Sequence, residues 1–308
     1  MRTLRETIAE AASRKVAVGH FNISNLEGVW AAFRAAQAVG AKSGKTIPVI
    51  IGVSEGEREF VGVPQVAALV ASIREEYQHP IYLNADHTYS FQKVKEAIDA
   101  GFDAVIIDGA KLPYEQNVAL AKECVAYARR VSGRGLLHGD IFGRGRDVLI
   151  EGELGFIGQS SKLLDSVPEG VALSGEALTK PEDAARFVRD TGVDMLAPAV
   201  GNFHGLVKNM DSLPEIDTKR VGEIAAATGV PLVLHGGSGS SEKEFKGAIA
   251  NGVACVHINT ELRVAYRAGL EKALKEMPNE LSPYKYLKVA GDAMQAVIEE
   301  KLKIFNNL

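Results

Sequence analysis

Short, nearly continuous apolar runs recur along the whole chain, and each ends at or next to Gly, Asn, Asp or His. Such runs are typical of parallel β-strands that are buried on both faces. Between them, apolar residues recur at helical spacing, and several of these segments begin with Ser, Asp or Pro-Glu, which signal a helix N-terminus. Strands are expected over residues 16–23, 47–53, 80–86, 104–109, 148–154, 195–201, 231–237 and 254–260, and helices over 25–39, 64–77, 90–100, 114–131, 180–191, 217–228 and 241–251.

This alternation of strand and helix, repeated eight times, predicts an α/β fold of the (β/α)8 TIM-barrel type. A doubly wound open sheet is the alternative, but no G-x-G-x-x-G motif follows the first strand to support it. No linker rich in Pro or Ser divides the chain, so residues 1–308 are expected to form a single barrel domain. Two segments, at about 132–147 and 155–177, exceed ordinary connection length and are expected to be lids or binding loops.

The composition limits the classes of function. With 46% hydrophobic and 24% charged residues among 308, the chain is neither disordered nor a coiled coil. Its 35 Lys and Arg against 39 Asp and Glu give a net charge of −4, which argues against nucleic-acid and membrane partners but permits a local pocket for a small anion. No apolar run could span a bilayer, the N-terminus lacks a secretion signal, and Cys124 and Cys255 form no C-x-x-C pair. A cytoplasmic protein is therefore expected.

In a TIM barrel the active site lies at the carboxyl ends of the strands. Four of the seven histidines fall at predicted strand ends, although a single histidine is most often structural. Three neutral imidazoles with one open position are typical of a catalytic zinc site. Asp86-His87, His204 and His235 together therefore predict a shared metal. The polar residues at the predicted strand ends are Asn22, Asn25, Ser54, Asp86, His87, Asp108, Glu151, Glu153, Asn202, His204, His235, Ser238, His257 and Asn259.

The segment VLHGGSGSSEKEFKGAI, residues 233–249, carries a second signal. A strand, a Gly-rich turn and a helix start offer backbone N–H groups and a positive dipole end to a phosphate. Thr260, after the next strand, is expected to cap a helix and to contribute a further donor. An ordinary tight turn is the alternative. The position after the seventh and eighth strands favours phosphate binding, because these loops commonly form the phosphate site of the fold.

Five motifs stand out along the chain: DHTYSFQKVKEAIDAGFDAVIIDGAKLPYEQNV, EGELGFIG, AVGNFHGLVK, VLHGGSGSSEKEFKGAI and NTELR. Together they resemble the class II, metal-dependent fructose-bisphosphate and tagatose-bisphosphate aldolase family. The resemblance runs from about Val18 to the C-terminal KLKIF, with order and spacing preserved. It implies reversible retro-aldol cleavage of a phosphorylated ketose to dihydroxyacetone phosphate and an aldehyde. It also implies one catalytic zinc with a second metal position, a monovalent cation, and a homodimer or homotetramer.

The resemblance assigns roles residue by residue. It makes Asp86 the acid/base for the hydroxyl and aldehyde oxygen at the cleaved bond, and Arg263 the group that reaches a distal phosphate. It makes His87, His204 and His235 the zinc ligands, with Asp108 and Glu153 as ligands of a displaced or second metal. The implied phosphate and substrate contacts are Asn25, Ser54, Gly205, Lys208, Gly236, Ser238, Asn259 and Thr260.

These roles agree with the chemistry. Cleaving a carbon–carbon bond beside a ketone leaves an enediolate, whose charge a Lewis acid on the adjacent oxygens stabilises. A carboxylate must also take the proton from the departing alkoxide. A lysine Schiff base is unnecessary, because the metal supplies the electron sink.

Several positions depart from the family pattern. Thr88 stands where the family has Gly, and is expected to add bulk beside the metal. Ser160 and Ser161 replace an acidic pair in the mobile loop after the fifth strand. His257 replaces an Asn near the enediolate, and Asn259 an Asp or Ala. The carboxylates that could replace the acidic pair, if the loop folds inward, are Asp165, Glu169 and Glu176.

His257 has two interpretations. As a catalytic residue, it is an imidazole larger than the family's amide, and its charge near neutral pH could add to or compete with the metal's field. With Thr88, it then predicts poor turnover of fructose 1,6-bisphosphate. Alternatively, it is a structural histidine, or it takes over the Asn hydrogen bond in an ordinary fructose-bisphosphate aldolase. A different ketose phosphate skeleton remains a rival, as does a non-catalytic binding barrel, against which Asp86 argues.

Overall fold

Eight parallel strands close into a barrel in the computed structural model, which describes residues 2–132, 147–158, 162–167, 169–207 and 215–308. Their order around the barrel is β1-β10-β9-β7-β5-β4-β3-β2, so strands that follow one another along the chain are also neighbours in space. All eight predicted strands, and with them the TIM-barrel fold, are confirmed. They are β1 (Val18–Asn22), β2 (Val49–Val53), β3 (Ile81–Thr88), β4 (Ala104–Ile107), β5 (Leu149–Leu154), β7 (Met195–Pro198), β9 (Leu232–Leu234) and β10 (Val253–Ile258).

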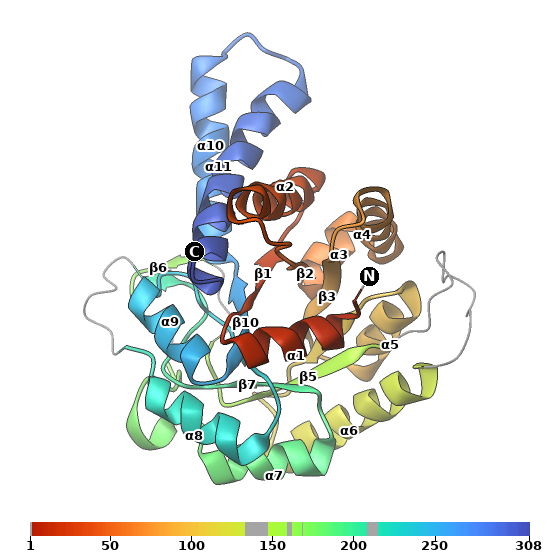
Figure 1. The fold of residues 1–308 in the computed structure, drawn as a ribbon, viewed down its shortest axis with the longest axis vertical. Helices are drawn as coiled ribbons and strands as arrows, with labels where there is room; N and C mark the ends of the chain where they lie inside the picture. Colours follow the sequence, from red (N-terminus) through yellow and green to blue (C-terminus); the bar gives the residue numbers. More distant parts are fainter. Residues whose placement is uncertain (1, 133–146, 159–161, 168, 208–214) are drawn as a thin grey trace.

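The seven predicted helices are present and surround the barrel (Figure 1). They are α2 (Leu26–Ser43), α4 (Val63–Tyr77), α5 (Phe91–Ala100), α6 (Tyr114–Val131), α7 (Pro181–Thr191), α8 (Thr218–Thr228) and α9 (Glu242–Ala250). Their ends follow helix-capping rules: Ser90 and Ser241 accept backbone N–H groups at the starts of α5 and α9, and Gly101 ends α5 in the left-handed region. Within the described residues, no helix combines the length and hydropathy that crossing a membrane requires.

The structure adds helical elements beyond the seven predicted ranges, among them the helix that was expected to start near Thr260. They are α1 (Leu4–Arg14), α3 (Glu55–Val61), the 3-10 turn η1 (Gly175–Ala177), α10 (Thr260–Glu276) and α11 (Pro283–Phe305). Helices α10 and α11 form a hairpin that extends beyond the barrel, and α11 packs back on α2 (Figure 1). The hairpin is tight, because a Cβ at Gly269 would lie 2.9 Å from the Ala290 Cα. Its first turn stays at the carboxyl ends of the strands, directly after β10.

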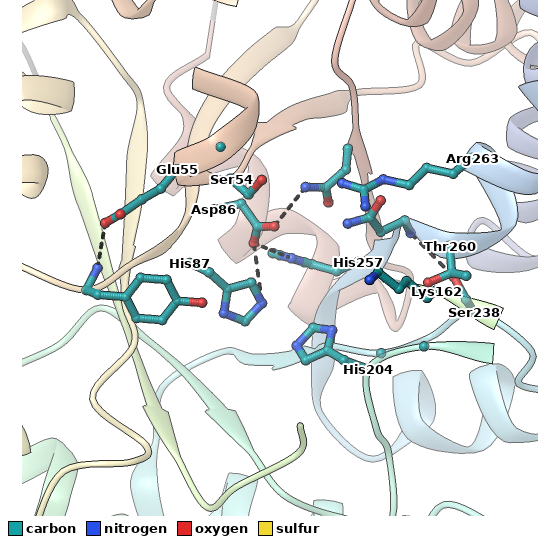
Figure 2. A pocket seen from close by; sticks show the side chains of 16 residues that line it. Ser54, Glu55, Asp86, His87, Lys162, His204, Ser238, His257, Thr260 and Arg263 are labelled. Atoms are coloured by element: carbon teal, nitrogen blue, oxygen red, sulfur yellow. Dashed lines mark hydrogen bonds and ion pairs between the residues drawn. The ribbon is translucent and has the colours of Figure 1, made fainter. Parts of the chain in front are cut away.

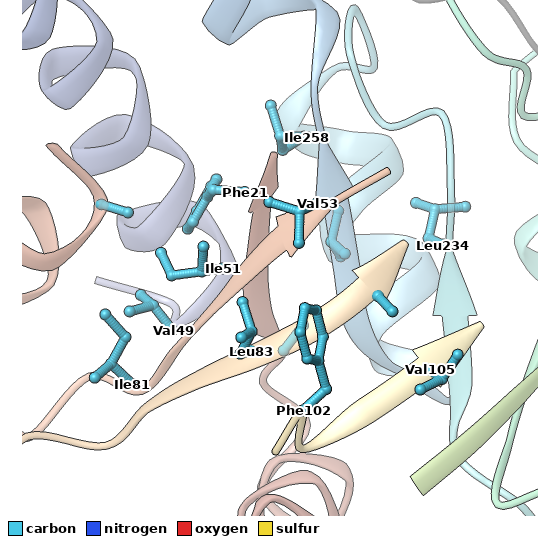
Figure 3. Packing of buried hydrophobic residues seen from close by; sticks show 14 of the residues in the cluster. Phe21, Val49, Ile51, Val53, Ile81, Leu83, Phe102, Val105, Leu234 and Ile258 are labelled. Atoms are coloured by element: carbon cyan, nitrogen blue, oxygen red, sulfur yellow. The ribbon is translucent and has the colours of Figure 1, made fainter. Parts of the chain in front are cut away.

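Apolar side chains fill two layers. The outer layer lies between the strands and the helices, and includes Val49, Ile51, Leu83 and Val105 (Figure 3). The inner layer fills the barrel at its amino-terminal end, where Leu4 and Ile8 of α1 pack against the strand starts. Helix α1 therefore buries apolar surface across this end of the barrel. The polar residues lie at the opposite end, where the strands have their carboxyl termini.

The two predicted long loops differ. Residues 133–146, almost all of the first, lie outside the described residues, as do 159–161 and 168 of the second. The second loop includes a strand, β6 (Leu163–Leu164), which pairs in parallel with β8 (Leu206–Val207) in the loop after β7. The Leu206 N–H also donates to the Lys162 carbonyl at 3.1 Å. The loop after β5 and the loop after β7 are therefore joined at the barrel mouth.

Candidate active site

The polar end of the barrel holds a cavity of about 360 Å³, which is within the size range of small-ligand sites (Figure 2). Strand ends, the loops that follow them and the first turn of α10 all contribute to its wall. The lining residues are Asn22, Ser54, Glu55, Gly56, Asp86, His87, Tyr89, Lys162, His204, Gly205, Gly236, Ser238, His257, Asn259, Thr260 and Arg263.

Three predicted metal ligands converge beside this cavity. His87 lies in β3, and His204 and His235 follow β7 and β9. One ring nitrogen of each lies within 4.8 Å of those of the other two. Nε2 of His87 is 3.3 Å from Nδ1 of His235, and Nε2 of His204 is buried with no hydrogen-bond partner among the described residues. The three imidazoles therefore direct ring nitrogens at one small volume.

An irregularity in β3 aims His87. The register of β3 against β4 shifts between Ala85 and Thr88, and His87 has φ +35°, which few residues other than glycine adopt. Bulges of this kind at barrel rims redirect side chains next to active sites. The loop after β5 holds His204 in place, because the backbone N–H of His204 donates to the Ile157 carbonyl at 2.8 Å.

Buried carboxylates surround the three imidazoles. Nδ1 of His87 lies 3.0 Å from Oδ2 of Asp108 and 3.5 Å from Oε2 of Glu153. Nε2 of His235 lies 2.7 Å from Oε1 of Glu151. His87, Asp108 and Glu153 themselves form a second group whose ligand atoms lie within 4.8 Å of one another. The structure thus brings together the residues expected for a displaced or second metal.

This crowding shifts the ionisation of the site. Burial, with Asp108 adding to it, raises the pKa of Glu153 to about 8. Burial opposes the charged form of His87, but Asp86, Asp108 and Glu153 outweigh that effect and raise the pKa of His87 to about 10. Neighbouring carboxylates favour the protonated form of both groups, and a bound cation would balance this buried negative charge. Because imidazole and carboxylate are ligands of divalent transition metals, these residues fit a metal ion.

Asp86 lies between the imidazole cluster and the rest of the cavity (Figure 2). Its Oδ2 accepts a hydrogen bond from Nδ2 of Asn22 at 2.8 Å, and its Oδ1 lies 3.4 Å from Nδ1 of His257. Burial opposes its ionised form, but the neighbouring imidazoles of His87 and His257 hold the pKa of Asp86 well below its usual value. The carboxylate is therefore ionised and able to accept a proton.

His257 is fixed within a stack of rings. The ring of His20, in β1, lies parallel to it with centroids 3.4 Å apart, and the ring of His235 covers its other face at 4.1 Å. Burial, reinforced by His20, lowers the pKa of His257 well below its usual value. Burial therefore disfavours the charge that was expected on His257 near neutral pH. His20 was not predicted because it lies inside a strand, although its two-residue spacing from Asn22 indicates the same face.

The Gly-rich loops form the opposite wall, where Figure 2 shows Ser238, Thr260 and Lys162. Oγ of Ser238 accepts the backbone N–H groups of Asn259 and Glu261 at 3.4 and 3.3 Å. Thr260 is the first residue of α10, with Asn259 as its N-cap, so the expectation that Thr260 caps this helix is wrong.

The glycines of this wall allow two loops to approach closely. Gly236 has φ +61°, and a Cβ there would lie 2.2 Å from the Phe203 carbonyl oxygen. Gly205 has φ +110° and lies against Leu164 of β6. Lys162 adds an ammonium group that was not predicted, although it belongs to the long loop singled out after the fifth strand. Lys208 lies outside the described residues.

The sequence matches the profile of the family "Fructose-bisphosphate aldolase class-II" over residues 2–308. The chain belongs to this family. It is 34% identical to fructose-bisphosphate aldolases from Staphylococcus aureus (strain Mu50 / ATCC 700699) and Geobacillus stearothermophilus, over 98% and 99% of this chain and 96% of each relative. The protein is thus an aldolase, a carbon–carbon lyase, and the alternative of a non-catalytic barrel is not favoured.

Solved structures agree with this assignment. The YdjI aldolase from Escherichia coli K12 has a TM-score of 0.77 at 26% identity, covering 98% of this chain and 96% of that one. A structure from Coccidioides immitis has a TM-score of 0.79 at 28% identity, with the same coverage of both chains. The class II family is generally metal-dependent, in agreement with the His and Asp groups described above.

The substrate contacts that the resemblance implies do not all reach the cavity of this aldolase. Ser54, Asn259 and Arg263 line it, but Asn25 does not. Asn25 caps α2 by accepting the Gly28 N–H at 3.0 Å, and its Nδ2 donates to the Tyr266 hydroxyl at 2.8 Å. Its role in the structure is to join α2 to α10.

Thr88 does not add bulk beside the metal site, contrary to expectation. It is fully buried and absent from the cavity wall, and its hydroxyl accepts a hydrogen bond from Nη2 of Arg58 at 3.1 Å. The side chain faces away because the shifted register that directs His87 toward the cavity places the next residue on the opposite side.

The loop carboxylates are also not where the family pattern would need them. Asp165, Glu169 and Glu176 are exposed, and none of them lines the cavity. Glu176 pairs with Lys180 at 2.8 Å on the surface. Ser160 and Ser161 lie outside the described residues. None of the three carboxylates therefore replaces the family's acidic pair in this arrangement.

Proposed function

We propose that this aldolase catalyses the reversible retro-aldol cleavage of a phosphorylated ketose to dihydroxyacetone phosphate and an aldehyde. The observation that supports this most directly is the composition of one cavity. A three-imidazole cluster and an ionised carboxylate lie on one side, and a wall of glycines, hydroxyls and an ammonium group lies on the other. The first set suits carbon–carbon bond chemistry, and the second suits a phosphate.

We assign His87, His204 and His235 as ligands of a single zinc ion, with Asp108 and Glu153 available for a displaced or second metal. When bound, the metal supplies a Lewis acid that stabilises the enediolate charge produced by cleavage. His87 and His235 are oriented for this role, since Asp108 and Glu151 accept hydrogen bonds from their outer ring nitrogens. Such outer partners fix both the tautomer and the angle of a ligating imidazole.

Asp86 performs the proton transfer in the proposed reaction. Its carboxylate takes the proton from the hydroxyl at the bond that breaks, and returns it to the aldehyde oxygen in the condensation direction. Asn22 holds one carboxylate oxygen at 2.8 Å and leaves the other toward the imidazoles. Nδ1 of His257 lies 3.4 Å from the second oxygen, and burial disfavours the charged form of this imidazole.

The phosphate of the ketone half would lie against Gly205, Gly236, Ser238 and Thr260. The first turn of α10 favours an anion there, because the positive end of the helix dipole acts at that point. Lys162, which lines the same wall, supplies positive charge. Lys208 is a further candidate on the family pattern.

The remaining assignments follow from the family. Zinc is the proposed metal, and a monovalent cation near the phosphate is proposed with it. A homodimer or homotetramer in the cytoplasm is proposed as the working form, without a nucleic-acid or membrane partner. The mildly acidic net charge of −4 supports the assignment without a nucleic-acid or membrane partner.

Comparison of wild type with Asp86→Asn tests the proposal. The zinc-loaded variant should bind dihydroxyacetone phosphate as wild type does, but its cleavage rate should fall by about 10²- to 10⁴-fold, the usual range for loss of a general base. Elemental analysis should find one transition metal per active site in wild type. Equal turnover by the two proteins would refute the role of Asp86, and the absence of bound metal with full activity would refute the metal assignment.

A further inference from the structure

Figure 2 shows two sides of the cavity around Asp86. Ser238, Thr260 and Lys162 lie on one side, at the wall assigned above to the phosphate of the ketone half. Ser54 and Glu55, from the start of α3, lie on the other side, and the Arg263 side chain extends from α10 toward them. A ketose bound with its phosphate at the first wall would direct its distal end to the second.

At this distal end, one buried carboxylate accepts hydrogen bonds from the donors of the cavity wall. Glu57, in α3, is only 6% exposed. Its Oε1 accepts a hydrogen bond from Nη2 of Arg263 at 2.5 Å. Its Oε2 accepts the N–H and the hydroxyl of Ser54, both at 2.8 Å, and Nδ2 of Asn22 at 3.0 Å. Glu57 therefore accepts four hydrogen bonds, all of them from three residues that line the cavity.

These donors are the kind that hold phosphate: a guanidinium, a hydroxyl and a backbone N–H. A second phosphate would carry a charge close to −2 at neutral pH. To reach Arg263 and Ser54, it would have to displace Glu57 or lie beside it. Displacement leaves a buried carboxylate without its partner, and juxtaposition sets like charges against each other, so both arrangements are unfavourable.

We propose that Glu57 is a specificity-determining residue that takes the place of a distal phosphate within the protein. The substrates are then ketose 1-phosphates whose distal end is an uncharged, hydroxyl-bearing chain, and 1,6-bisphosphates are disfavoured. This inference rests on the proposed function, since it assumes that the ketone-half phosphate occupies the Gly-rich wall. The neighbouring groups suit such a chain, because Glu55 presents a carboxylate and Tyr89 a phenol ring at the same lip of the cavity.

The isosteric variant Glu57→Gln tests this directly. It removes the charge but keeps an oxygen that can accept from Ser54 and Asn22. For wild type, kcat/KM should be higher for fructose 1-phosphate than for fructose 1,6-bisphosphate. In Glu57→Gln, the ratio should shift toward the bisphosphate by about tenfold or more, the effect of removing one close charge at a partly screened site. The double variant Glu57→Gln/Arg263→Ala should lose this shift, because Arg263 is then no longer available to the phosphate.

Glu55→Gln is the matched control. It removes one negative charge from the same edge of the cavity without touching the pair of Glu57 and Arg263, since Glu55 accepts the backbone N–H of Tyr89 at 2.9 Å. In Glu55→Gln, the kcat/KM ratio should shift toward the bisphosphate by clearly less than in Glu57→Gln. Equal shifts would refute the specific role of Glu57 and indicate a general charge effect.

Binding of unreactive analogues separates this inference from the proposed function. Calorimetry on the zinc-loaded proteins would use hexitol 1-phosphate and hexitol 1,6-bisphosphate, which lack the ketone. Wild type should bind the monophosphate at least as tightly, and Glu57→Gln should prefer the bisphosphate. Stronger wild-type binding of the bisphosphate, or an unchanged preference in Glu57→Gln, overturns the inference. The expected binding pattern without cleavage of either ketose supports the inference and refutes only the proposed reaction.

Discussion

Replacement of Thr88 by Val should lower stability and leave catalysis nearly intact. Thr88 and Val have similar shapes, so the change removes the hydroxyl and little else. That hydroxyl is the acceptor for Nη2 of Arg58, whose guanidinium is itself buried, with only 3% of the residue exposed. Burial lowers the pKa of Arg58, which indicates that its charge is poorly solvated and depends on its protein acceptors.

The expected loss can be worked out from these contacts. Nη1 of Arg58 keeps the carbonyls of Val53 and Asp86 at 2.6 and 3.1 Å, so only one of its three observed acceptors disappears. A hydrogen bond to a charged group contributes about 1.5–3 kcal/mol. Since a β-branched residue is retained in the strand, the secondary-structure preference changes little. The free energy of unfolding of Thr88→Val should therefore fall by about 2 kcal/mol.

Urea denaturation followed by circular dichroism measures the loss, with Thr88→Ser as the control. The Ser variant keeps the hydroxyl and loses one methyl group, which should cost about 1 kcal/mol. For both variants, kcat/KM should stay within about threefold of wild type, less than 1 kcal/mol of transition-state energy. If Thr88→Val keeps full stability but loses activity tenfold, the side chain acts at the reacting carbons and the structural argument is wrong.

Three further changes test the site. Removal of metal by a chelator should abolish cleavage, zinc should restore it, and full activity in chelated protein would contradict the imidazole cluster as a metal site. Gly236→Ala should cost at least about 1–3 kcal/mol of stability, measured by urea denaturation, because it combines a left-handed residue with a Cβ 2.2 Å from the Phe203 carbonyl oxygen. An unchanged denaturation midpoint would show that the loop shifts freely. Ser238→Ala should weaken dihydroxyacetone phosphate binding by about 1 kcal/mol, or fivefold, measured by calorimetry; identical affinity would mean that the phosphate lies elsewhere.

The cluster of three imidazoles could be predicted from the sequence because parallel strands bring their carboxyl ends to one face. His87, His204 and His235 each follow a strong apolar run, so their positions in space follow from their positions along the chain. The same reasoning placed Asp86 and His257 in the cavity. The fold was equally predictable, since all eight strands carry the same pattern of apolar residues.

Glu57 and Lys162 could not be found in this way. Glu57 stands three residues after Ser54, the spacing of a helix capping box, so its sequence context indicates a local role. Its partner Arg263 is 206 residues away, and only the closed barrel brings the two together. Lys162 reaches the cavity through the pairing of β6 with β8, each strand being two residues long, which is too short to show a pattern.

Two different arguments lead to poor turnover of fructose 1,6-bisphosphate, and they predict different behaviour. The sequence placed the cause at the reacting carbons, through Thr88 and a charged His257. The structure removes the bulk of Thr88, which faces Arg58, and burial disfavours a charge on His257, so only the size of the His257 ring remains from that argument. A change at the reacting carbons would slow every ketose phosphate alike, since all share the bond that breaks. The pairing of Glu57 with Arg263 slows only those that carry a second phosphate, so the ratio of kcat/KM between fructose 1-phosphate and fructose 1,6-bisphosphate, and not either value alone, distinguishes the two causes.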